Sequence, residues 1–196
     1  MNRELFPAFL KLEGRPVLVV GGGPVAASKL AALLAAGAEV TVVAPEITGA
    51  IAALPVRVHR RPFEPSDLDE AWFVVAAAPP EVNRAVSAAA GERRLFVNAV
   101  DDPAHATAYL GGVVRKSGVT VAISTDGRAP ALAGLIREGL EALLPADLER
   151  WLQQSDILRA EWRAAGVPME HRRPRLLDAI NRLYEEREAS LAGGQE

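Results

Sequence analysis

Short apolar runs alternate with helix-like segments over the first hundred residues. Five runs are rich in β-branched or other apolar residues and predict strands: Val17–Val20, Val40–Val43, Val56–Val58, Trp72–Ala77 and Phe96–Val100. Two segments between them predict helices: Pro24–Ala36, followed by Gly37, and Glu81–Ala90, closed by Gly91. Alternation of this kind is typical of a parallel sheet with crossover helices, and uninterrupted apolar strands indicate a sheet buried on both faces.

The pattern changes after Asp102-Pro103. Two more strands are predicted at Tyr109–Val114 and Val119–Ile123, and the turn-forming residues between them favour a hairpin. From there on only helices are predicted: Ala131–Leu143, Ala146–Ala165 and about Pro174–Glu188. The sequence therefore predicts an α/β protein with an added helical part.

Composition narrows the classes of function. The chain has 196 residues, a net charge of −3 and no cysteine, which excludes disulfides, thiolate metal sites and cysteine nucleophiles. A weakly acidic chain has no overall basic field for nucleic acid or anionic lipid. There is neither a signal-peptide pattern nor a long uncharged apolar run. We therefore expect a soluble cytoplasmic protein that binds no nucleic acid and no membrane.

The loop after the first predicted strand carries the clearest signal. Gly21-x-Gly23-x-x-Ala26 matches the dinucleotide fingerprint and stands between a strand and a helix, as that fingerprint requires. Gly21 permits the tight turn, Gly23 lets a pyrophosphate approach the backbone, and Ala26 lets the helix pack closely on the sheet. The helix N-terminus, with Pro24 in its first turn, favours the phosphate charge. The alternative is a tight strand–helix turn that binds nothing.

An acidic residue is expected about 20 residues further on, where it would bind the cofactor ribose. Glu46 lies at that spacing, although it follows Pro45 and would otherwise be a solvated loop residue. The absence of an arginine directly after the strand favours NAD. Arg57, Arg60 and Arg61 keep NADP as the alternative.

Several segments in order resemble one family, the precorrin-2 dehydrogenases that also form the N-terminal module of sirohaem synthases. They are Leu5-Phe6-Pro7, VLVVGGGPVAASK, VTVVAPEI, Arg61-x-Phe63 with Asp67-Leu68, AWFVVAAAPPEVN, FVNAVDDP and VAISTDGRAPALAGLIRE. They cover about residues 5–145. The resemblance implies NAD-dependent oxidation of precorrin-2 to sirohydrochlorin, and some members of the family also insert ferrous iron. It further implies a homodimer with an NAD-binding Rossmann domain at 1–113, a central dimerisation region at 114–145 and a helical domain at 146–196.

The resemblance also assigns residues to the site. The cofactor-binding residues would be Gly21, Gly22, Gly23, Pro24, Val25, Pro45, Glu46 and Asn98. Asp101, in the segment Asn98-Ala99-Val100-Asp101, would be the catalytic group, and no resident metal is assigned. From the residues alone, Asp101 is either a base that takes a substrate proton or a turn residue before Pro103. His105 nearby is either a base, an iron ligand or a structural residue.

A tetrapyrrole rich in carboxylates requires a cationic site, for which arginine is well suited. The candidates for substrate binding are Arg115, Lys116, Ser124, Arg128 and Arg137. Arg137 would otherwise pair with Glu141 along its helix, and the loop from Ser124 to Arg128 would otherwise cap the next helix. The run from His171 to Arg175 is either a further cationic site or a solvated helix start. The alternative function is a non-catalytic NAD sensor, which would need the glycine loop but no base.

Overall fold

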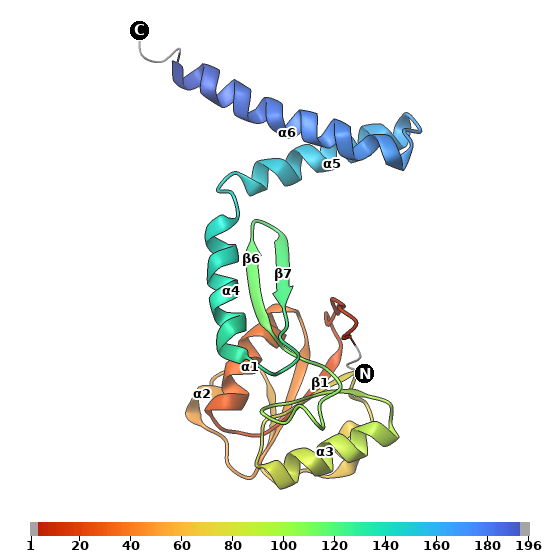
Figure 1. Cartoon of the computed structure of the whole chain (residues 1–196). Coiled ribbons are helices and arrows are strands. Elements are labelled where there is room, and N and C mark those ends of the chain that lie inside the picture. Colours follow the sequence, from red (N-terminus) through yellow and green to blue (C-terminus); the bar gives the residue numbers. More distant parts are fainter. Residues whose placement is uncertain (1–3, 193–196) are drawn as a thin grey trace. The chain divides into compact units, whose positions relative to one another are not determined.

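The computed structural model describes residues 4–192, which divide into two compact units. One unit reaches to Gly111 and includes Ser124–Pro130, and the other holds Gly112–Ile123 and the chain from Ala131 onward. Figure 1 shows the elements of both. The chain therefore passes from one unit to the other three times.

The first unit is built on a parallel sheet of five strands in the order β3-β2-β1-β4-β5. The strands are β1 (Pro16–Val20), β2 (Glu39–Val43), β3 (Arg57–His59), β4 (Phe73–Ala76) and β5 (Phe96–Ala99). This order, with β1 at the centre and crossovers to either side, is that of the first five strands of a Rossmann-type fold. The predicted α/β class and the five predicted strands are confirmed, with ends that differ by one or two residues.

Helices cover both faces of this sheet. Val17 and Val19 of β1 face α1 (Pro24–Ala35) and α2 (Gly49–Ala52), while Leu18 and Val20 face α3 (Pro80–Glu92) and the short 3-10 helix η1 (Pro65–Leu68). This alternation follows from the two-residue period of a strand, and it explains why β1 and β4 are apolar at nearly every position. The short α2 and η1 have no periodic pattern and were not predicted.

The end of α3 differs from the prediction. Gly91 lies inside the helix, which continues to Glu92, and Arg94 takes the left-handed conformation with φ 58°. The amide of Leu95 donates a hydrogen bond to the carbonyl of Ala90 at 3.0 Å, and the Leu95 side chain packs against the core. Packing of Leu95 against the core thus determines where α3 ends, whereas Gly91 was expected to end it.

The second unit consists of a hairpin and three helices. β6 (Gly112–Lys116) pairs antiparallel with β7 (Val119–Ile123), and α4 (Pro130–Leu143), α5 (Leu148–Ala164) and α6 (Met169–Ala192) follow. Ser117 and Gly118 form the two-residue turn with φ 47° and 80°, as a tight hairpin requires. The predicted hairpin is confirmed, but β6 starts at Gly112, three residues later than predicted, and continues through Arg115 and Lys116.

The start of α6 also corrects the prediction. The helix begins at Met169, and Pro174 lies inside it. As the sixth helical residue, Pro174 lacks the amide that would bond the carbonyl of exposed Glu170. The run His171–Arg175 therefore forms the first turns of an established helix. Arg172 donates two hydrogen bonds to the carbonyl of Val167, at 2.9 and 2.8 Å, and so fixes the turn between α5 and α6.

Candidate functional site

The glycine loop after β1 is closely packed against two neighbouring strand ends. Gly21 has φ 131°, and a β-carbon there would lie 2.2 Å from the carbonyl oxygen of Ala77, just after β4. A β-carbon on Gly22 would lie 1.8 Å from the carbonyl oxygen of Glu46, beyond β2. No side chain fits at either position, so both glycines are required by sterics alone. The prediction that Gly21 permits a tight turn is confirmed. The close approach of the Glu46 carbonyl to Gly22 is not predicted from the sequence.

Gly23, Pro24 and Val25 occupy the N-terminus of α1, where the surroundings are open. Gly23 is the N-cap, and a β-carbon on it would meet no other described part of the chain within 4 Å. Among the described residues no side chain caps this helix, and Pro24 and Val25 are exposed. Ala26 is completely buried against the sheet. A bare helix N-terminus beside an open glycine is the arrangement that accepts a phosphate group.

Thr48 is a polar residue of this site that sequence reasoning missed. Its amide donates a hydrogen bond to the carbonyl of Gly22 at 3.0 Å, so it lies directly against the glycine loop. Its hydroxyl is buried and has no hydrogen-bond partner within the described part of the chain. A buried hydroxyl without a partner is costly and calls for an explanation, and a bound polar ligand supplies one. The open glycine and this hydroxyl together fit a dinucleotide.

Pro45 and Glu46 follow β2 at the same edge of the sheet. Both are exposed, and the backbone carbonyl of Glu46 is the part that contacts Gly22. The position after β2 is where a dinucleotide-binding fold places the ribose acid. The structure thus brings Glu46 to the glycine loop.

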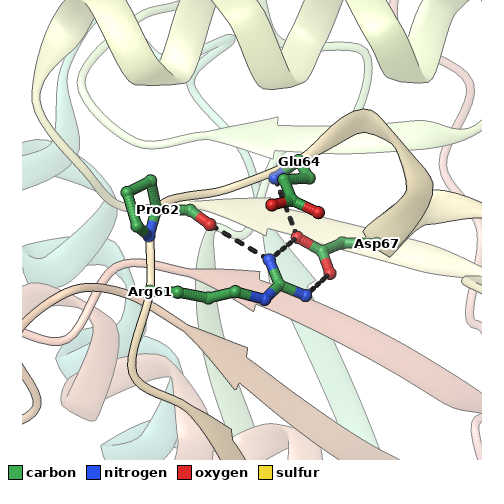
Figure 2. A network of polar contacts seen from close by, with 4 residues as sticks. All are labelled: Arg61, Pro62, Glu64 and Asp67. Atoms are coloured by element: carbon green, nitrogen blue, oxygen red, sulfur yellow. Dashed lines mark hydrogen bonds and ion pairs between the residues drawn. The ribbon is translucent and has the colours of Figure 1, made fainter.

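Arg61, which follows β3, is held by a local network shown in Figure 2. Its guanidinium donates to Asp67 in a paired arrangement, with Nη1 2.9 Å from Oδ2, and also donates to the carbonyl of Pro62 at 3.0 Å. The amide of Glu64 donates to the same carboxylate at 2.9 Å. The hydrogen bond from Arg61 holds the pKa of Asp67 below its ordinary value, with the Glu64 amide acting in the same direction. Arg57 is paired with Glu39 at 3.4 Å.

Asn98 lies in β5, and Asp101 lies in the loop that follows this strand. Asn98 is only 7% exposed; its amide nitrogen donates to the carbonyl of Ala108 at 3.0 Å, and its Oδ1 is buried with no partner among the residues described. Asp101 is exposed and takes the left-handed conformation with φ 57°. The Val100 amide donates to the carbonyl of Ala76 at 2.9 Å, which fixes Asp101 to the end of β4. Asp102 and His105 form an ion pair next to it, with Nδ1 2.8 Å from Oδ2.

The segment Ser124–Arg128 folds into a tight turn in the same unit. The Ser124 hydroxyl accepts a hydrogen bond from the amide of Asp126 at 3.1 Å, and Asp126 and Gly127 are both left-handed, with φ 53° and 72°. Arg128 is exposed, with its guanidinium 3.7 Å from the Asp126 carboxylate. The Thr125 hydroxyl accepts from the amide of Ala129 at 3.2 Å, just before α4. This turn therefore has the capping role given as the alternative, and Arg128 stays accessible.

The other three predicted substrate contacts belong to the second unit. Lys116 donates from Nζ to the carbonyl of Leu144 at 2.7 Å, just beyond the end of α4. Arg137 pairs with Glu141 at 2.7 Å and with Glu138 at 3.2 Å. Arg115 is exposed on β6. Lys116 and Arg137 thus have structural partners, and Arg115 remains exposed to solvent.

Two other kinds of site are absent from the described range. Within residues 4–192, no helix is both long enough and apolar enough to cross a membrane. The same part of the chain holds no group of three His, Cys, Asp or Glu side chains arranged to bind a metal ion.

The fold and the glycine loop define the class of protein: a Rossmann-type dinucleotide-binding protein, with its site at the carboxyl edge of the sheet. Residues 8–112 match the family described as putative NAD(P)-binding, and residues 117–143 match the one described as sirohaem biosynthesis protein central. The chain belongs to this putative NAD(P)-binding family and carries the sirohaem biosynthesis central region directly after that domain.

Relatives with curated names agree with this family. Siroheme synthase 3 of Aeromonas hydrophila subsp. hydrophila is 41% identical over 175 residues, which are 87% of this chain and 37% of that protein. A siroheme synthase of Methylobacillus flagellatus is 44% identical over 152 residues, 75% of this chain and 32% of the relative. The chain thus spans about a third of the length of these relatives.

A solved structure matches nearly the whole chain. It is described as SirC, precorrin-2 dehydrogenase, and is 27% identical with a TM-score of 0.70, covering 90% of this chain and 89% of that one. The similarity therefore includes the second unit as well as the nucleotide-binding one. It confirms the Rossmann-type fold expected from the sequence.

Proposed function

We propose that this protein oxidises precorrin-2 to sirohydrochlorin with NAD. The observation that carries the proposal is that one sheet edge holds both an open glycine loop and a carboxylate-bearing loop. Gly21 follows β1, Asp101 follows β5, and β4 between them is hydrogen-bonded to both neighbours. The near-complete match to a solved precorrin-2 dehydrogenase supports the choice of substrate.

The residues of the glycine loop would hold the cofactor. The N-terminus of α1 at Gly23, Pro24 and Val25 would bind the diphosphate, and the buried Thr48 hydroxyl would gain the partner it lacks. Asn98 would line the nicotinamide end of the site from β5. When bound, NAD supplies an oxidised nicotinamide that accepts a hydride from the substrate.

We propose NAD rather than NADP on the basis of the charges around the ribose position. The exposed carboxylate of Glu46 suits a ribose hydroxyl and repels a 2′-phosphate. Arg61 and Arg57 are engaged by Asp67 and Glu39, which weakens their claim to bind a phosphate. Titration with each dinucleotide, followed by tryptophan fluorescence, tests this choice; tighter binding of NADP would contradict it.

In the first unit, the proposed substrate contacts are Asp101, Ser124 and Arg128. The further predicted contacts Arg115, Lys116 and Arg137 belong to the second unit and are considered by themselves. Arg128 and Arg115 are exposed, so they can reach substrate carboxylates without breaking an internal bond. Lys116 already binds the carbonyl of Leu144, and Arg137 already pairs with Glu141, so each would have to bind the substrate in addition to its present partner. Asp101 would contact the ring that loses hydrogen, and its left-handed backbone holds it at the end of β5.

We also propose a homodimer, with its interface in the predicted dimerisation region at 114–145. An apolar stripe on α4 is exposed, including Leu135 at 67% and Leu143 at 79%, together with Leu132 and Ile136. Such a stripe is typical of a protein–protein contact. Light scattering on the wild type and on Leu135→Glu tests this, because the variant should be monomeric. Equal masses for the two would contradict an interface at α4.

The function itself is tested by anaerobic turnover of precorrin-2 with NAD, following the absorbance of NADH and of sirohydrochlorin. We expect turnover by the wild type and a loss of about 10²-fold or more for Asp101→Ala, since Asp101 is proposed to contact the ring that loses hydrogen and misplacing a reacting group can cost that much. Binding of NAD without any turnover would contradict the enzyme and favour a sensor. Ferrous iron added to sirohydrochlorin in the same cuvette tests whether the protein also inserts the metal.

A further inference from the structure

Asp102 and His105 are joined by hydrogen bonds between their side chains and between their backbones. Nδ1 of His105 lies 2.9 Å from Oδ1 and 2.8 Å from Oδ2 of Asp102, so one ring nitrogen bonds both carboxylate oxygens. The backbone amide of His105 donates to the carbonyl of Asp102 at 3.2 Å, which closes the turn that carries both side chains. The Asp102 side chain is 21% exposed and the imidazole 44%.

The loop that carries this pair is attached to the sheet at both ends. At its start, the amide of Val100 bonds the carbonyl of Ala76. At its end, the amides of Thr107 and Ala108 donate to the carbonyl of Val97 at 2.9 Å, and the Thr107 hydroxyl accepts from the Val97 amide at 2.8 Å. The pair is therefore held beside Asp101 at the edge of the sheet where ligands of this fold bind.

The carboxylate determines which ring nitrogen of His105 carries the proton. An ionised carboxylate only accepts hydrogen bonds, so in the neutral imidazole the proton must lie on Nδ1 and the lone pair on Nε2. The hydrogen bond from His105 holds the pKa of Asp102 below its ordinary value, and the charge of Arg84 on α3 adds to this, which keeps the carboxylate ionised. A base with a fixed tautomer and an accessible second nitrogen is the result.

The oxidation described under Proposed function releases a proton, and this inference rests on that function. We propose that His105, oriented by Asp102, accepts that proton. One C–H bond of the tetrapyrrole breaks, and its electron pair leaves as hydride to the oxidised nicotinamide. One N–H bond breaks as well; its electron pair stays in the macrocycle and completes the new double bond. The proton goes to Nε2 of His105 and then to water.

Imidazole suits this task better than a metal-binding or purely structural role. A general base works best when its pKa lies near the working pH, and imidazole is the side chain whose ordinary pKa does so. The groups that act on His105 and its partner are the carboxylate of Asp102 on the same loop and the guanidinium of Arg84 on α3.

The test compares His105→Asn, His105→Ala and Asp102→Asn with the wild type in single-turnover oxidation of precorrin-2 as a function of pH. Asn at position 105 retains an N–H for Asp102 but has no base. We expect a loss of about 10²-fold in the rate of oxidation for both His105 variants, without the wild-type decline on the acid side. Imidazole added to His105→Ala should restore activity.

Two measurements do not depend on turnover. Nitrogen-15 NMR of the His105 ring should show the neutral tautomer with its proton on Nδ1 in the wild type and a mixture of tautomers in Asp102→Asn, because a carboxylate only accepts hydrogen bonds. The affinity for NAD should change less than about twofold in the His105 variants, since the proposed role is in proton transfer. The control is Asp69→Asn, which removes a carboxylate paired with Arg93 at 2.9 Å before β4, at the other edge of the sheet; it should behave as the wild type.

A wild-type rate and pH profile in His105→Asn, no rescue by imidazole, or an unchanged His105 tautomer in Asp102→Asn would each overturn the proposal. In those cases the wild type would still oxidise precorrin-2, so the proposed function would stand. Failure of the wild type to oxidise precorrin-2 would overturn both.

Discussion

The carbonyl oxygen of Glu46 lies where Gly22 leaves space for it: a β-carbon on Gly22 would be 1.8 Å away. This contact connects the loop after β1 to the loop after β2. The same residue, Glu46, thus contacts the glycine loop through its backbone, and its carboxylate is the group proposed to bind the ribose. The two predicted parts of the cofactor site are consequently one structural unit.

The three glycines should respond differently to alanine. Gly22→Ala forces a side chain into a backbone carbonyl and should lower the free energy of unfolding by about 2 kcal/mol or more. Gly23→Ala meets open space, so it should change the melting temperature by less than about 3 °C while weakening NAD binding about tenfold or more. Calorimetry with and without NAD checks both. A Gly23→Ala protein that binds NAD normally would contradict a phosphate at this position.

Two threonines offer a matched pair. The Thr48 hydroxyl is buried with no partner in the described chain, so Thr48→Val should leave the melting temperature of the cofactor-free protein unchanged or raise it. It should weaken NAD binding about 2–10-fold, the worth of one hydrogen bond. The Thr107 hydroxyl bonds the Val97 amide at 2.8 Å, so Thr107→Val should destabilise the protein by about 1 kcal/mol. Equal effects of the two substitutions on NAD affinity would exclude Thr48 from the cofactor site.

Asp67 should give the protein a stability that depends on pH. Its pKa is lowered in the folded protein, chiefly by the hydrogen bond from Arg61. A carboxyl group with a depressed folded pKa adds stability above its unfolded pKa of about 4, and this stability is lost as the pH falls through the folded value. Asp67→Asn should therefore lower the melting temperature at pH 7 by about 2–6 °C, and the difference should shrink as the pH falls from about 5 to 3. A difference independent of pH would indicate a packing effect alone.

Lys116 and Arg128 were both predicted to bind substrate, but the structure gives them different surroundings. Lys116→Met removes a hydrogen bond to the carbonyl of Leu144 and should cost about 1 kcal/mol of stability. Arg128→Met should not affect melting, since its side chain is exposed, but should raise the KM for precorrin-2 about tenfold or more. Kinetics and thermal melts of the two variants distinguish these effects. A Lys116→Met protein of normal stability and raised KM would show that Lys116 serves the substrate.

Local pattern was enough to predict most of the first unit. The strands β1, β2 and β4 are short, apolar and bounded by glycine or proline, and the glycine loop has a fingerprint in which each position has its own steric reason. These features depend on neighbours in sequence, which is why they can be read without a structure.

Features that depend on distant contacts were not predictable in this way. The end of α3 is set by burial of Leu95 rather than by Gly91, and Pro174 is tolerated inside α6 because the helix is already established at Met169. The hydroxyl of Thr48 carries no sequence signal; it became a candidate only because folding places it, buried and unbonded, against Gly22. Asp102 and His105 have the spacing of a single turn, but the sequence does not show that one ring nitrogen of His105 bonds both oxygens of Asp102.

The three passages of the chain between the two units affect how the protein must be synthesised. Ser124–Pro130 belongs to the nucleotide-binding unit, where Gly127 lies close to Tyr109 and Pro103, yet the ribosome makes it only after the hairpin β6–β7. The nucleotide-binding unit thus cannot be complete until residue 130 has emerged, and the hairpin emerges while that unit is unfinished. For the same reason, a chimaera that exchanges the second unit between relatives needs three junctions: one on each side of the hairpin and one at the start of α4.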